Sequence, residues 1–315
     1  MYLPHHSQSS VIDCDDFGGD VRQETALRSA IEFAGARKHD VFGEVRSIAS
    51  EAPEHIRPLI QYQLHGLERS KGYRPALLVA CSQLAPTSLP YHEIIKRSAI
   101  LHLFHESCLL FDDLFDRAPL RRGRRTAHRV FGRVPTICAA VWAKEVGYSM
   151  YPNEPEIIKA LHRCTMDLID AEAFQWVART APRPMPITDW ERIARGSTGA
   201  LFRLASALAG LQSDQEIIEA IAISYHGIDD LHDLLDIPGL GGGGNDDLRD
   251  SIPTLPSCFI SGLSRQQLES AVPECISYIR TQLTLPLSTR QLVFKPFFDE
   301  LSALLSLVPH SPLKG

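Results

Sequence analysis

Two short segments of the chain carry aspartates at a spacing that brings carboxylates together on a helix. In the first segment Asp112 and Asp116 are four residues apart, with Asp113 between them. On a helix Asp112 and Asp116 share one face, whereas Asp113 projects about 100° away. Oxygen ligands on one helical turn suit Mg²⁺, which takes one or two carboxylates together with waters and substrate phosphate oxygens. The segment predicts a metal site, although a solvated acidic turn is an equally common reason for one such segment.

A second segment repeats the arrangement with Asp229, Asp230 and Asp233, again among leucines. Two such segments in one helical chain are hard to attribute to chance, and facing helices of a bundle often build metal sites. A carboxylate frame of this kind can hold Mg²⁺ and a diphosphate, and it can neutralise the charge of a departing diphosphate. The pair therefore indicates ionisation chemistry on a diphosphate ester.

Basic residues and a glycine-rich segment accompany the aspartates. Arg121, Arg122, Arg124 and Arg125 follow the first cluster closely, and guanidinium groups bind phosphate with paired donors. The segment Gly239–Gly244 follows the second cluster and could form a loop that closes over the site. A plain surface linker is the alternative for that segment.

Helices must position these side chains, and the apolar pattern predicts helices throughout. Apolar residues recur three and four residues apart, as at Ile100, Leu103 and Phe104, whereas alternating strand patterns are weak. Breaks are expected at positions 53, 86–90, 119, 135, 152–155, 181–186, 239–244, 253 and 256. We therefore expect a single all-α domain at 21–315, a bundle of roughly ten or more helices around a central cavity, after a flexible N-terminal tail at 1–20.

Composition narrows the class of protein. The 315 residues are 44% hydrophobic and 22% charged, which is typical of a globular chain. A net charge of -6 argues against nucleic-acid binding, and no apolar run of about 18 residues predicts a membrane span. Seven cysteines form no Cys-x-x-Cys pair, and the N-terminus lacks signal-peptide character. A cytoplasmic protein with reduced thiols is expected.

Several motifs around the aspartates match one known family. The first cluster is followed by Arg121-Arg122-Gly123 and then by His128-Arg129-Val130-Phe131-Gly132, and it is preceded by Lys71-Gly72-Tyr73-Arg74-Pro75. The second cluster is followed by Thr254-Leu255-Pro256. Over about residues 60–260 the chain resembles the trans-isoprenyl diphosphate synthases. These helical prenyltransferases join isopentenyl diphosphate to an allylic diphosphate.

The resemblance implies a role for each matching residue. It implies three Mg²⁺ ions held by the six aspartates, which ionise the allylic diphosphate so that the double bond of isopentenyl diphosphate attacks the cation. The residues that would bind isopentenyl diphosphate are Lys71, Arg74, His105 and Arg122. Arg121 would bind the allylic diphosphate and, with Asp112, Asp116 and Asp229, would be catalytic. The resemblance also implies a homodimer.

Departures from the family pattern leave other functions open. Ser197 and Ile252 stand where the family has lysines that bind the allylic diphosphate, and His226 stands where it has glutamine. Losing two such cations weakens binding by more than about 1 kcal/mol each, although Arg195 could substitute in part. One alternative is a terpene cyclase on the same scaffold, in which the cation is captured by its own chain. The other is a non-catalytic partner subunit of a prenyltransferase.

Product length is expected to depend on the helix before the first cluster. In the family, side chains one turn before that motif form the floor of the pocket, and here Ser107 and Cys108 are small. Phe104, another turn back, would be a deeper floor. The resemblance therefore implies a product of about twenty carbons in isoprenoid or terpenoid biosynthesis.

Overall fold

A computed structural model describes residues 38–65, 67, 72–180, 184–237, 252–261 and 264–309 of the chain. The predicted tail at 1–20, Lys71 and the segment Gly239–Gly244 lie outside these described residues. Helices account for nearly all regular structure in the described part, so the predicted all-α class is confirmed.

In chain order, the elements of the described part begin with residues 38–50, which are helical. The helices and strands after them are α2 (Arg57–Gln63), α3 (Tyr73–Leu84), α4 (Tyr91–Phe115), β1 (Leu120–Arg121), β2 (Arg124–Arg125), α5 (Ala127–Phe131), α6 (Arg133–Met150), α7 (Pro155–Ala178), α8 (Ile187–Gly196), α9 (Thr198–Leu208), α10 (Gln215–Leu234), α12 (Arg265–Glu269), α13 (Val272–Leu283) and α14 (Lys295–Ser306). Two 3₁₀ turns, η3 (Leu255–Cys258) and η4 (Thr289–Phe294), complete the described part.

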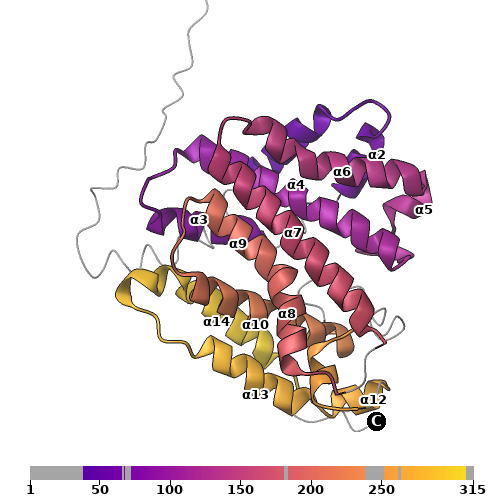
Figure 1. The fold of residues 1–315 in the computed structure, drawn as a ribbon, viewed down its shortest axis with the longest axis vertical. Helices are drawn as coiled ribbons and strands as arrows, with labels where there is room; N and C mark the ends of the chain where they lie inside the picture. The colour runs from indigo at the N-terminus through magenta and orange to yellow at the C-terminus, as the bar shows by residue number, and fades with distance from the viewer. Residues whose placement is uncertain are drawn as a thin grey trace, which may run out of the picture.

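Helix α4 lies between two hydrophobic clusters and contributes to both. Ile100, Leu101 and Phe104 pack into the larger cluster, which joins α4 to α3 and to α7 through α14. Ala99 and Leu103 pack into a smaller one with residues 38–50, α2 and α6. A helix that is apolar on opposite sides is stable only when it is buried. In Figure 1, α2, α4, α5 and α6 accordingly gather at one end of the bundle, α10, α13 and α14 at the other, and α7 and α9 run between them.

Proline and glycine divide the helices mostly where the sequence predicts. Pro155 occupies the first turn of α7, where its missing N–H costs nothing. The break predicted at Pro135 is misplaced, because α6 begins at Arg133 and accommodates that proline in its first turn. The chain instead turns at Gly132, whose φ of 89° separates α5 from α6.

A two-stranded hairpin is the one β-structure among the described ranges. Leu120 pairs with Arg125 and Arg121 with Arg124 in antiparallel register. The two turn residues between them, Arg122 and Gly123, have φ of 52° and 75°. Positive φ at both central residues is typical of a type I′ turn, whose twist matches that of the flanking strands. The hairpin places two consecutive arginines over the end of α4.

No helix of the described part is both long and apolar enough to span a membrane.

Candidate active site

The first aspartate cluster lies in the last turn of α4, and its three carboxylates have different surroundings. Asp113 is 1% exposed and accepts a hydrogen bond of 2.6 Å from Arg121 Nε, while its Oδ2 has no hydrogen-bond partner. Burial raises the pKa of Asp113, and Arg121 offsets part of that rise. Asp113 is therefore anchored to the hairpin, and one of its oxygens stays available to a ligand.

Asp116 pairs with a residue that follows α7, whereas Asp112 lies near charged residues of both the hairpin and α7. Arg179, just after α7, donates to Asp116 Oδ1 at 2.7 Å. Burial raises the pKa of Asp112 to about 7, and Arg121 lowers it while Glu172 of α7 raises it further. Burial, followed by Asp116, likewise raises the pKa of Glu172. Glu172 is thus a further carboxylate beside the first cluster, one to which the sequence reasoning assigned no role.

The second cluster occupies the last two turns of α10, and its middle aspartate is held by protein donors. Asp230 Oδ2 accepts a 2.9 Å hydrogen bond from the indole N–H of Trp190 and a 2.7 Å bond from the backbone N–H of Leu255. Trp190 is fully buried on α8. Asp230 therefore joins α10 to α8 and η3. Asp229 and Asp233 are four residues apart, so both lie on one face of α10, and Asp230 projects from a different face.

Part of the predicted diphosphate pocket is assembled between α3, α4 and the hairpin. Arg74 Nε and His105 Nδ1 are both buried without a hydrogen-bond partner. Burial, and then the charge of Arg74, lowers the pKa of His105 well below its usual value. Arg122 contributes to the same effect, so the three predicted residues lie close enough to act on one another. Lys71 lies outside the described residues.

The pocket also contains a carboxylate that the sequence reasoning missed. Glu106 is 1% exposed and accepts a hydrogen bond from Arg122 Nη2 at 3.1 Å. Burial alone would raise its pKa, but His102 and Arg122 outweigh burial and hold the pKa far below its usual value. An acidic residue within the apolar run of α4, directly after His105, was the available signal.

The residues predicted to set product length lie on α4 below the first cluster. Phe104 and Ser107 are buried, and Cys108 is partly buried with its thiol donating to the carbonyl of Phe104 at 3.4 Å. Burial raises the pKa of the Cys108 thiol to about 12, so it remains a neutral, small side chain. Their part in product length stays a prediction.

The two positions that lack lysine carry neutral side chains. Ser197 donates back to the carbonyl of Ile193 at 2.8 Å, and Ile252 is apolar. Thr198 Oγ1 lies 3.0 Å from His226 Nδ1, and burial lowers the pKa of His226 to about 4. This part of the site therefore gains no positive charge from His226 at neutral pH.

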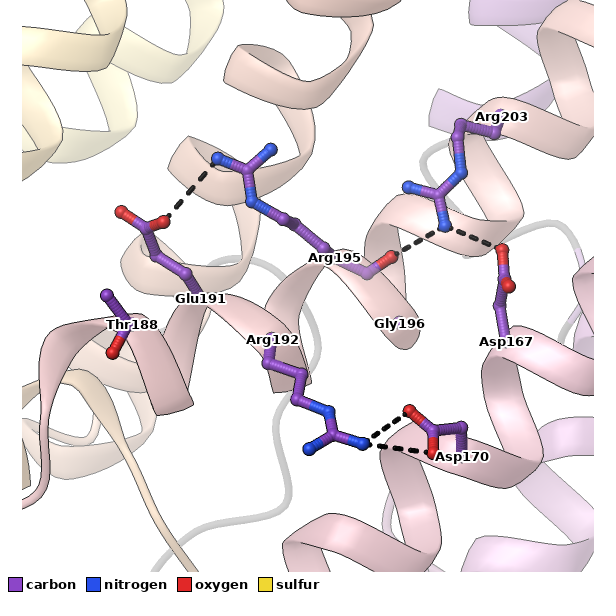
Figure 2. Close-up of a pocket in the computed structure, with 8 residues that line it drawn as sticks. All are labelled: Asp167, Asp170, Thr188, Glu191, Arg192, Arg195, Gly196 and Arg203. Carbon is purple, nitrogen blue, oxygen red and sulfur yellow. Dashed lines mark hydrogen bonds and ion pairs between the residues drawn. The ribbon is translucent and has the colours of Figure 1, made fainter.

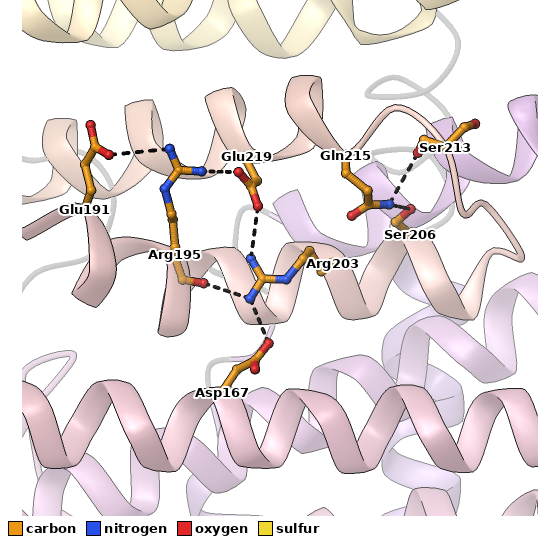
Figure 3. A network of polar contacts seen from close by, with 8 residues as sticks. All are labelled: Asp167, Glu191, Arg195, Arg203, Ser206, Ser213, Gln215 and Glu219. Carbon is orange, nitrogen blue, oxygen red and sulfur yellow. Dashed lines mark hydrogen bonds and ion pairs between the residues drawn. The ribbon is translucent and has the colours of Figure 1, made fainter. Parts of the chain in front are cut away.

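Arg195, the residue that could substitute in part for a missing lysine, is paired with acidic residues. It lines an open pocket of about 340 Å³ between α7, α8 and α9 (Figure 2). Figure 3 shows its guanidinium between Glu191 and Glu219, while Arg203 joins Glu219 to Asp167. This network cross-links α7, α8, α9 and α10, and each of its arginines is paired with a carboxylate.

The carboxylates suit Mg²⁺ by chemistry. Within the described residues, no three His, Cys, Asp or Glu side chains already form a metal-binding group. The orphaned Oδ2 of Asp113 and the raised pKa of Asp112 nevertheless mark a carboxylate group short of positive charge. Hard anionic oxygens at one end of a helix are the donors that Mg²⁺ prefers, so the residues fit this ion.

Comparison with known proteins identifies one family. A family model described as Polyprenyl synthetase matches residues 54–282. A geranylgeranyl pyrophosphate synthase of Penicillium janthinellum is 30% identical over 46% of this chain and 42% of its own length. A fusicoccadiene synthase of Phomopsis amygdali is 24% identical over 64% of this chain and 28% of its own length. The chain thus spans less than half the length of these two curated relatives.

Solved structures agree on the fold. A polyprenyl synthetase of Streptomyces coelicolor superposes with a TM-score of 0.69 at 19% identity, covering 90% of this chain and 99% of that structure. At 19% identity the match shows only that the two proteins share a fold.

Proposed function

Because the chain belongs to the polyprenyl synthetase family, we propose that it is a Mg²⁺-dependent prenyltransferase. Its substrates would be isopentenyl diphosphate and an allylic diphosphate, and its product a longer trans-prenyl diphosphate of about twenty carbons. The observation that carries the proposal is the pair of buried, unpartnered nitrogens on Arg74 and His105, next to Arg122. Buried polar nitrogens without partners are costly, and an anionic diphosphate would accept from Arg74 Nε and, in the tautomer with the proton on Nδ1, from His105.

Each group of residues has a separate task in this reaction. The Asp112 and Asp116 carboxylates on α4, together with Asp229 and Asp233 on α10, would hold Mg²⁺, which supplies charge neutralisation for the departing diphosphate. Asp113 and Asp230 would each give one oxygen to protein donors, which fixes the two helix ends, and the unpartnered Oδ2 of Asp113 would be free to join the Mg²⁺ ligands.

Substrate binding falls to the basic residues. Arg121 lies beside Asp113 at the first cluster and would contact the allylic diphosphate. Arg74, His105 and Arg122 would bind isopentenyl diphosphate through N–H donors. His105 would do so as a neutral imidazole, because its pKa is low.

The test is incubation of purified protein with Mg²⁺ and allylic diphosphates of increasing length, with and without isopentenyl diphosphate. Mass analysis should show a longer diphosphate only when isopentenyl diphosphate and Mg²⁺ are both present. Phe104→Ala should lengthen the product, because Phe104 is the large buried side chain two turns before Asp112. Unchanged product length in that variant would remove Phe104 as the stop.

A terpene cyclase is the second candidate, and two observations favour it. Ser197 and Ile252 leave the allylic side without the family lysines, and one relative is named for a diene product. A hydrocarbon formed from an allylic diphosphate without isopentenyl diphosphate would replace the first proposal by this one. Diphosphate release of either kind would eliminate a non-catalytic subunit.

A homodimer through α6 and α7 is part of the proposal. Exposed apolar side chains follow the helical period on both neighbouring helices: Val134, Ile137 and Val141 on α6, and Met166, Ile169 and Val177 on α7. An apolar face of this kind is typical of a buried interface. Light scattering should give a dimer for the wild type and a monomer for Val134→Glu/Ile169→Glu. A wild-type monomer would refute this part.

A further inference from the structure

Glu106 is a buried charge in the middle of the basic pocket. Its Oε1 accepts from Arg122 Nη2 at 3.1 Å and its Oε2 from Gln63 Nε2 of α2 at 2.8 Å. His102 Nε2 lies 3.4 Å from Oε1. Packed apolar residues usually stabilise a fold as well as a buried ion pair does. The two hydrogen bonds and the nearby imidazole of His102 therefore explain how the charge is tolerated, whereas its position suggests what it does.

The hairpin is fixed to one face of α4 by two arginine–carboxylate pairs. Arg121 binds Asp113 and the next residue, Arg122, binds Glu106. Asp113 and Glu106 are seven residues apart, which places them two turns apart on the same helix face. The I′ turn alone sets the backbone of Arg122, whereas Glu106 sets the direction of its side chain.

Arg122 keeps donors for a ligand while it binds Glu106. A guanidinium has five N–H groups, and the contact with Glu106 is made through Nη2. The side chain of Arg122 is 33% exposed, whereas that of Glu106 is 2% exposed. Glu106 is therefore the buried member of the pair, and the exposed N–H groups of Arg122 are the part that a substrate can reach.

We propose that Glu106 is a positioning residue that aims the outer N–H groups of Arg122 at the diphosphate of isopentenyl diphosphate. This inference rests on the proposed function. Glu106 does not touch the substrate, because two anions would compete for the same donor. Its neighbours His105 and Arg74 form the other walls of the pocket, and the charges of Arg74, Glu106 and Arg122 all act on His105.

The first test is Glu106→Gln, which keeps the size of the side chain. Its amide is uncharged and one of its two polar atoms is an NH₂ group that cannot accept, so the bond to Arg122 loses its charge and Arg122 is held less firmly. The KM for isopentenyl diphosphate should rise roughly tenfold, while kcat and the KM for the allylic substrate change by less than about twofold. An unchanged or lower KM for isopentenyl diphosphate would overturn the inference.

Glu93→Gln is the matched control. Glu93 also lies on α4 and pairs with Arg97 Nε at 3.1 Å and with the hydroxyl of Tyr151 at 2.9 Å. It is about 20 Å from Glu106 along the helix. This variant should leave both KM values unchanged. An equal rise in KM would show that Glu106→Gln acts through the stability of α4, against the inference.

A double variant separates positioning from a structural role. Arg122→Lys keeps the charge but loses the planar fork, so it should raise the KM for isopentenyl diphosphate by itself. If Glu106 acts through Arg122, adding Glu106→Gln should raise that KM no further. An additive rise would refute the inference. Should Glu106→Gln fail to fold, Gln63→Met should give a smaller rise for the same reason, and no rise would count against it.

Calorimetry with inorganic diphosphate separates this inference from the proposed function. A wild type that consumes no isopentenyl diphosphate would refute the proposed function. The inference would still be decided by binding: a roughly tenfold weaker Kd for inorganic diphosphate in Glu106→Gln supports it, and equal Kd values overturn it. A wild type that binds no diphosphate would also overturn it.

Discussion

Trp190→Phe tests the connection that holds the second aspartate cluster in place. Trp190 is fully buried, and its indole N–H donates to Asp230 Oδ2 at 2.9 Å. Phenylalanine keeps an aromatic ring in contact with His226 and Tyr278 but has no donor. Asp230 would then lose the indole donor and keep the backbone N–H of Leu255.

Two contributions give the expected loss of stability. A hydrogen bond to a charged group contributes about 1.5–3 kcal/mol. The smaller ring leaves a void on the order of 35 Å³, which costs about 1 kcal/mol at about 24 cal/mol per Å³. The free energy of unfolding of Trp190→Phe should therefore fall by about 3 kcal/mol. Because α8 and η3 both bind Asp230, the variant should also lower kcat.

Urea unfolding followed by circular dichroism measures the loss, with the denaturant slope checked for two-state behaviour. Trp176→Phe is the control, because Trp176 is 53% exposed and its exchange should change stability by less than about 0.5 kcal/mol. A loss below about 1 kcal/mol in Trp190→Phe would refute the reasoning, since the bond to Asp230 would then contribute nothing measurable.

Three further predictions concern the same half of the molecule. Asp229→Asn should lower kcat/KM by about 100-fold and Asp230→Asn by less than about tenfold. The smaller loss is expected because an Asn oxygen at position 230 still accepts hydrogen bonds from Trp190 and Leu255. Equal losses of kcat/KM in steady-state kinetics would contradict this prediction. Gly196→Ala should cost about 1–3 kcal/mol in urea unfolding, since its new Cβ would lie 2.5 Å from a side chain of α7; a neutral exchange would show that α7 and α8 separate freely. The pKa of His226 is about 4 in the folded protein, whereas its ordinary value of 6.5 returns on unfolding. The free energy of unfolding should therefore decrease as the pH falls from about 6.5 to 4, by up to about 3 kcal/mol. His226→Gln should show a smaller drop in Tm between pH 7 and 5 than the wild type.

The all-α class and the directions of the aspartates follow from the sequence, because both depend on the helical period. Asp112 and Asp116 share a helix face by their spacing of four, and the next residue after Asp112, Asp113, binds Arg121 whereas Asp116 binds Arg179. The pairing of Asp113 with Arg121 is also local, since only eight residues separate them. Local spacing thus predicts which side chains share a face.

Tertiary structure decided which partner each charged group meets. Arg179 binds Asp116 across 63 positions, Trp190 binds Asp230 across 40, and Gln63 binds Glu106 across 43. Such pairs depend on which helices pack together, and no local pattern encodes that choice. Helix packing also pairs Arg195 of α8 with Glu219 of α10, although in sequence Arg195 lies close to Ser197, one of the positions that lack lysine.

The sequence by itself therefore determined the helices, the two aspartate clusters and the family motifs, because each is a matter of residue type and short spacing. Only the packed structure decided that Asp230 is held by α8 and η3 and that Arg122 is held by a buried glutamate. The physical reason is burial: a charge removed from water must find its donors wherever the fold brings them.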